Sequence, residues 1–196
     1  MKKFLLACLA AAFAFAIPAV VRAADTSHTF ETKDAPISAP APVPASSPPT
    51  TIQYALPYPG ILTDSPLYFL KRIRDNVMIT LITDPAKKVQ FYLLQSDKFL
   101  AMALSFDAKN DTEHAIGAAQ LSQLNMSQMV SQLSQLKAQG STLSPEIVAK
   151  AKTSVAKHAE VIGALEDKAS ADQKQVIGQI LDAFKHFSTD LGKLGG

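Results

Sequence analysis

The chain has 196 residues, which is enough for one domain with a sizeable core and accessory segments. Its 17 acidic residues nearly balance its 19 basic ones, and this argues against a protein that binds nucleic acid through charge. A single cysteine excludes a fold built on internal disulfides, and the few glycines favour helices.

Residues 1–23 have the pattern of a secretory signal peptide. Two lysines open the chain, an apolar run covers residues 4–21, and V-R-A at 21–23 fits cleavage after Ala23. Cleavage there would leave 16 basic against 17 acidic residues and no cysteine. Two alternatives stay open, because the apolar run could be retained as an anchor and L-L-A-C at 5–8 resembles a lipoprotein cleavage box. We therefore expect an extracytoplasmic protein that is secreted, periplasmic, or tethered to membrane or wall.

Residues 24–53 form a predicted linker. They hold six prolines among Ala, Ser and Thr, and proline favours extended polyproline II backbone. Large apolar residues are too few to offset the entropy of ordering, so we expect a disordered spacer. It could be a stalk that holds the domain away from a membrane or wall, or only a passive linker.

Two helices are predicted after the turn L-P-Y-P-G at 56–60. The first covers about residues 66–82, with Pro66 at its first position. Lys71 and Asp75 lie four residues apart on its polar side, where they can form an ion pair. Its apolar residues lie on one broad face, which we expect to be buried as a plug under the other helices. They are Leu67, Leu70, Ile73, Val77, Met78, Leu81 and Ile82. The second helix starts at Asp84-Pro85 and ends near residue 106, which implies a tight corner or an antiparallel hairpin.

Three longer helices complete the prediction. They cover about residues 112–139, 145–167 and 170 to the C-terminal end, and Ser170 with Gln173 forms a capping-box pattern. Apolar residues three and four apart give each a seam, with Gln123 as a polar member in the first and His158 in the second. The sequence thus predicts an all-α fold, in which five helices form a bundle and the last three pack lengthwise in up-down order.

The stretch from Tyr54 to Pro85 resembles a bacterial domain family of unknown function, DUF5667. The matching features are L-P-Y-P-G-I-L at 56–62, S-P-L-Y-F-L-K-R at 65–72 and D-P-A-K-K at 84–88. The following helices keep the same layout to about residue 135, so we expect residues 54–196 to be one helical domain of this kind. The resemblance implies an exported or membrane-tethered protein. It carries over no enzymatic activity and no catalytic residues.

Candidate metal ligands are sparse. Asp182 and His186 share one face of the last helix, and His158 could approach them if the last two helices are neighbours, giving a zinc or copper site. The alternative is a buried seam histidine and a surface pair. No G-x-S-x-G, H-E-x-x-H, Walker or G-x-G-x-x-G pattern occurs, so we expect a non-enzymatic protein without a cofactor.

Two surfaces are candidates for contact with partners. Lys71, Arg72 and Arg74 form a basic cluster that could meet lipid head groups or a wall polymer, or simply be solvated. The glutamine-rich helix at 112–139, with Met126 and Met129, suits an adaptable protein interface or self-association, or simply a soluble helix whose apolar stripe belongs to the core. The sequence therefore predicts an exported binding or scaffolding module of the cell envelope, with an extracytoplasmic carrier of a small ligand or metal ion as the alternative.

Overall fold

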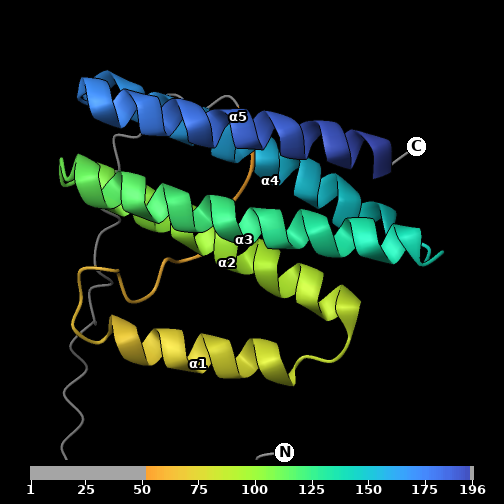
Figure 1. The fold of residues 1–196 in the computed structure, drawn as a ribbon. Coiled ribbons are helices and arrows are strands. Elements are labelled where there is room, and N and C mark those ends of the chain that lie inside the picture. The colour runs from red at the N-terminus through yellow and green to blue at the C-terminus, as the bar shows by residue number, and fades with distance from the viewer. Residues whose placement is uncertain (1–51, 195–196) are drawn as a thin grey trace, which may run out of the picture. The chain divides into compact units, whose positions relative to one another are not determined.

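A computed structural model describes residues 52–194. The predicted leader, at residues 1–23, and residues 24–51 of the predicted linker lie outside the described residues. Within residues 52–194 five α-helices follow one another and no strand occurs, as Figure 1 shows. They are α1 (Tyr68–Leu81), α2 (Pro85–Asp107), α3 (Thr112–Ala138), α4 (Pro145–Ala164) and α5 (Ala171–Leu194). The predicted all-α fold class with five helices is confirmed.

Helices α2 to α5 enclose the core. α2 and α3 form a long hairpin, α5 packs against α3 and α4, and α4 returns to α2, which closes a ring of four helices. The largest fully buried side chains all lie in this ring or in the short turn that follows α4. They are Phe106, Phe184, Leu100, Met102, Met126, Met129, Leu133, Ile162, Leu165, Ile177, Ile180 and Leu191. The predicted lengthwise packing of the last three helices holds for α3 with α5 and α4 with α5, whereas α3 and α4 occupy opposite corners of the ring.

Short polar residues start the long helices. The Asp84 carboxylate accepts the N–H of Ala86 at 2.8 Å, and Pro85 takes the first position of α2, where no N–H is needed. At α5 the predicted capping box is present. The Ser170 N–H donates to Gln173 Oε1 at 2.9 Å, and the Gln173 N–H donates to Ser170 Oγ at 3.4 Å.

Two helix ends differ from the prediction. Regular α1 begins only at Tyr68, so Pro66 precedes the helix. Before it the backbone forms turns, in which the Tyr68 N–H donates to the Ser65 carbonyl and the Leu70 N–H to the Leu67 carbonyl. α4 ends at Ala164, and Leu165–Lys168 continue as a 3₁₀ turn. That tightening is common in the last turn of a helix.

Helix α1 is turned the opposite way from the prediction. Its apolar side chains point outward, with Ile73 56% and Leu81 73% exposed, while Lys71 is only 5% exposed. Lys71 Nζ lies 4.9 Å from the ring centre of Phe99 on α2. The backbone of α1 approaches the other helices less closely than α2 to α5 approach one another, and Figure 1 shows it beside the hairpin of α2 and α3. The prediction of a buried plug is therefore wrong, because α2 to α5 complete the core among themselves.

Candidate functional site

A cluster of polar side chains lies inside the helical ring. Its members are Tyr54, Ser96, Asp97, Ser122, Ser154 and His158. Ser96 and His158 occupy the inward stripes of α2 and α4, and Tyr54 reaches in from the segment before α1. The cluster therefore joins three helices and the N-terminal end of the described chain.

The carboxylate of Asp97 is the centre of this cluster. Its two oxygens accept hydrogen bonds from Ser154 Oγ and from the Tyr54 hydroxyl, each at 2.6 Å. His158 Nδ1 donates to the Ser154 carbonyl oxygen at 2.7 Å, because a carbonyl can only accept. The other ring nitrogen, Nε2, lies 3.1 Å from Ser96 Oγ and 3.9 Å from Asp97 Oδ1.

Burial sets the protonation states of the cluster. Burial lowers the pKa of His158, and the nearby Asp97 carboxylate opposes that shift without reversing it. The imidazole is therefore neutral at pH 7. Burial and the hydrogen bond to Asp97 raise the pKa of Tyr54, so its hydroxyl keeps its proton and donates it to the carboxylate.

The cluster has the residue types of a hydrolase triad but a different arrangement. A triad places its serine and its carboxylate on opposite ring nitrogens, whereas here Ser96 and Asp97 both approach Nε2 of His158. Ser154 Oγ lies 3.3 Å from Nδ1, but it donates its proton to Asp97, and Nδ1 donates to the Ser154 carbonyl oxygen. Ser96 and His158 are fully buried. A surface hollow of about 480 Å³ reaches Tyr54 and Asp97, yet neither Ser96 nor His158 lines it. These hydrogen bonds join α2, α3 and α4 to one another and to the Tyr54 segment.

The predicted metal ligands are not brought together. His158 is buried and stacks on Phe184 of α5, with ring centres 5.3 Å apart. Asp182 and His186 each lie two residues from Phe184, so the helix turns them away from His158 to the surface, and Asp182 pairs with Lys185 at 2.9 Å. Among residues 52–194, no group of three or more His, Cys, Asp and Glu side chains could hold a metal ion.

The predicted pair of Lys71 and Asp75 is present, but it lies on the inner side of α1. Lys71 Nζ is 2.9 Å from Asp75 Oδ2, and Arg74 Nη2 is 2.7 Å from Asp75 Oδ1. Burial opposes ionisation of Asp75, but the two cationic hydrogen bonds outweigh it and lower its pKa. The carboxylate thus anchors both basic side chains at the edge of α1.

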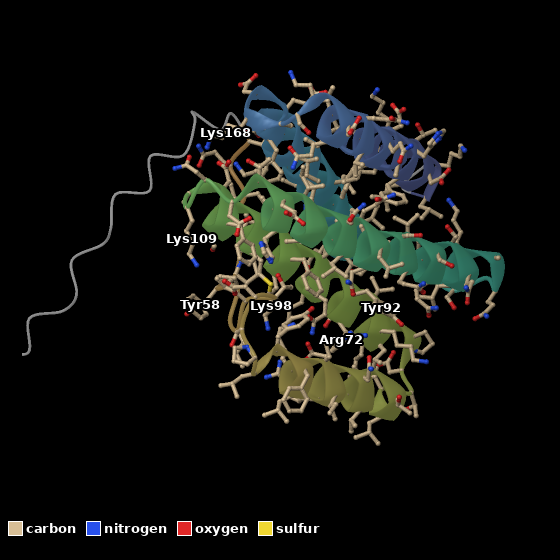
Figure 2. The ribbon with its side chains drawn as sticks, turned by 60° about the vertical axis from the view of Figure 1, so that its left-hand side comes forward. Tyr58, Arg72, Tyr92, Lys98, Lys109 and Lys168 are labelled. Atoms are coloured by element: carbon tan, nitrogen blue, oxygen red, sulfur yellow. The ribbon has the colours of Figure 1, made fainter. Side chains whose placement is uncertain are left out.

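A second hollow, of about 380 Å³, gathers positive charge next to α1. It is lined by Pro57, Tyr58, Pro59, Gly60, Ile61, Lys71, Arg74 and Lys98. Three of these residues are cationic and none is acidic, and we name this feature the basic hollow. Figure 2 shows Tyr58 and Lys98 on this side of the molecule. Sequence reasoning found Lys71 and Arg74 but missed Lys98, which comes from α2.

Arg72 belongs to a separate groove between α1 and the hairpin of α2 and α3. The groove has a volume of about 520 Å³, and Arg72 shares it with Tyr92, as Figure 2 indicates. Gln95 also lines it and is 5% exposed, and its Oε1 atom has no hydrogen-bond partner within residues 52–194. Of the predicted basic cluster, Arg72 thus lines only this groove and Arg74 only the basic hollow, while Lys71 lines both.

A family model described as "Domain of unknown function (DUF5667)" matches residues 60–176. The chain belongs to this family. Searches of curated proteins and of solved structures found no match. The DUF5667 match extends the expected resemblance from residue 135 to the first turn of α5, so it covers the basic hollow from Gly60 onward and the buried histidine. Tyr54 and Tyr58 precede it.

No helix of the DUF5667 chain between residues 52 and 194 is both long and apolar enough to cross a membrane.

Proposed function

We propose that the chain is an exported, non-enzymatic helical module that holds to another component of the bacterial cell envelope through the outward face of α1. This face consists of Leu67, Phe69, Leu70, Ile73, Val77, Met78 and Leu81. Each of these side chains is between 45% and 73% exposed. Large apolar side chains gathered on one exposed face are typical of interaction sites, whereas scattered ones need no explanation.

The size of the outward face supports this proposal. Seven large side chains at roughly half exposure offer on the order of 600 Å² of apolar surface, which is the upper end for the largest patch of a monomer. Folding does not account for this surface, since the core lies within α2 to α5. A partner that covers the patch would gain the hydrophobic free energy that folding leaves unused.

Export and the absence of catalysis are supported by the sequence and by the polar cluster. The leader pattern at residues 1–23 predicts passage out of the cytoplasm. The cluster around Asp97 resembles a catalytic site only in composition, because Ser96 and His158 are buried side by side.

Photo-crosslinking in intact bacteria tests the proposed function. The full chain, exported by its own leader, carries a benzophenone amino acid either at Ile73 on the outward face or at Leu94, an exposed leucine of α2. We expect adducts with an envelope component, lipid or protein, from position 73 and not from position 94. A chain that stays in the cytoplasm, or that gives no adduct from position 73, would contradict the proposal.

A carrier of small polar ligands is the second candidate, and the groove beside α1 favours it. Gln95 Oε1 has no hydrogen-bond partner there among residues 52–194, and Asn125 and Gln128 from α3 line the same space. Buried polar atoms without partners are uncommon in folded proteins, so a ligand donor could complete this one. Thermal-shift screening of polar metabolites, repeated with Gln95→Leu as the control, should then give a stabilising ligand that the variant loses. A screen without such a ligand would end this alternative.

A further inference from the structure

We infer that the outward face of α1 rests on a lipid bilayer with anionic headgroups, and that the basic hollow receives those headgroups. This inference rests on the proposed function, since it names the component that the face contacts. It combines two observations, an apolar helix face that the rest of residues 52–194 leaves exposed and a neighbouring hollow whose charged lining residues are all cationic.

The charges around α1 favour an anionic surface. Lys71, Arg74 and Lys98 line the basic hollow, and Asp75 is the single carboxylate paired with two of them. These three cations and Asp75 leave a formal charge of +2 at the basic hollow. Arg72 adds another exposed cation one residue from Lys71. Helices that lie on membranes combine these features, with Leu and Phe toward the acyl chains and Lys or Arg toward the headgroups.

The dimensions of α1 fit a helix that lies in the membrane plane. Its 14 residues make a rod about 20 Å long, which is shorter than the roughly 30 Å hydrocarbon core. Tyr58, 82% exposed at the mouth of the basic hollow, has the amphipathic side chain that membrane interfaces favour. The face therefore dips into the bilayer while the basic hollow stays at headgroup level.

A second copy of the chain fits this face less well. In a two-fold antiparallel pair of α1 helices, residues near the helix centre come close to their own copies, and Arg74 lies at that level, at the edge of the outward face. The pair would bring two guanidinium groups together. Two patches of this size would bury about 1,200 Å² in total, the lower limit of stable interfaces. Anionic phosphates, in contrast, attract Arg74.

Tryptophan fluorescence tests the inference, because the natural chain has no tryptophan. The exported protein is prepared with Phe69→Trp on the outward face, or with Leu94→Trp on α2 as the matched control. Each is mixed with vesicles of phosphatidylcholine alone or with added phosphatidylglycerol. We expect a blue shift, and quenching by brominated lipid, for Phe69→Trp with anionic vesicles only. Leu94→Trp should stay unchanged even if a retained leader holds the molecule on the vesicle.

The cations are tested in the Phe69→Trp protein. Adding Arg74→Gln and Lys98→Gln, which remove two cations of the basic hollow, should weaken binding to anionic vesicles about 25-fold, since each basic residue near such a surface contributes about a factor of five. Lys185→Gln with Lys193→Gln, two exposed lysines on α5, should leave the affinity unchanged. Equal weakening by both pairs would overturn the role of the basic hollow.

Several results would overturn the membrane proposal. These are an unmoved Phe69→Trp spectrum, equal shifts with neutral and anionic vesicles, equal shifts at positions 69 and 94, or a shift that depends on protein concentration without vesicles. The last result would assign the face to a second copy. A protein adduct from position 73 in cells, together with no vesicle binding, would overturn the lipid assignment and leave the proposed function standing.

Discussion

His158 makes the stability of this protein depend on pH. Burial lowers its pKa in the folded chain below the ordinary value of 6.5, against the opposing charge of Asp97. Below pH 6.5 the unfolded chain therefore binds a proton that the folded chain does not. The free energy of unfolding is largest above pH 6.5 and decreases as the pH falls toward the folded-state pKa, by at most about 1.4 kcal/mol per pH unit. Urea denaturation at pH 7.5 and 5.5 should measure this decrease.

Two variants separate His158 from other titrating groups. His158→Phe keeps an aromatic ring against Phe184 and removes the titration, so the protein should be less stable at both pH values but lose less stability between them. His186→Asn, on the surface of α5, should behave like the unmodified chain. If His158→Phe loses as much stability between the two pH values as the unmodified chain, the burial of a neutral imidazole is not the cause.

Sequence reasoning placed His158 correctly on the inward seam of its helix but not among its neighbours. A helical period shows which residues share a face, and the seams of α4 and α5 were predicted in this way. It does not show which residues of a distant helix meet that face. The contacts of His158 with Ser96 and Asp97 span 62 and 61 positions, so no local pattern could reveal them. In α3 the buried polar residue is Ser122, whereas the prediction chose Gln123.

Helix α1 exposes its apolar side chains, so these side chains should contribute little to the stability of the folded chain. Leu70 and Val77 are about half exposed, so Leu70→Gln with Val77→Gln should change the free energy of unfolding by no more than about 0.5 kcal/mol each. Leu100→Ala, in the fully buried stripe of α2, is the control and should lose about 2–5 kcal/mol. Urea denaturation of the three proteins measures both effects. A large loss in the α1 variant would mean that its apolar face is covered within the folded chain.

The orientation of α1 could not be predicted because its sequence signal is ambiguous. An apolar stripe on a helix normally marks the side that faces the core. The same stripe arises when an outside partner covers it, and periodicity alone cannot separate the two cases. The pair of Lys71 and Asp75 was correctly predicted from its spacing, but such pairs usually lie in solvent. Here the ammonium group of Lys71 lies over the ring of Phe99 on α2, and this contact between two helices could not be predicted from the spacing.

At the scale of the whole described chain, stability is concentrated in the ring of α2 to α5. Every large and fully buried side chain belongs to these helices or to the 3₁₀ turn after α4. The segment before α1 is hydrogen-bonded to α4 of the ring. The Ile52 N–H donates to Glu160 Oε2 at 3.1 Å, and Lys157 Nζ donates to the Ile52 carbonyl at 3.2 Å. α1 is thus an arm between two attachments, the Ile52–Tyr54 segment and the start of α2.

This arrangement predicts that α1 opens before the rest of the helical ring. Regions with few buried apolar contacts open at lower free energy than the core, and amide hydrogen exchange reports that difference. In exchange measured by mass spectrometry, amides of α1 should exchange at least about tenfold faster than those of α2 and α5, which corresponds to about 1.4 kcal/mol or more. α5 is the suitable control, because it is also amphipathic but buries its apolar side, including Phe184 and Leu191. If the amides of α1 are as well protected from exchange as those of α5, α1 does not open separately from the ring. A covering partner should slow exchange in α1 alone, because it adds contacts to the outward face and none to the core.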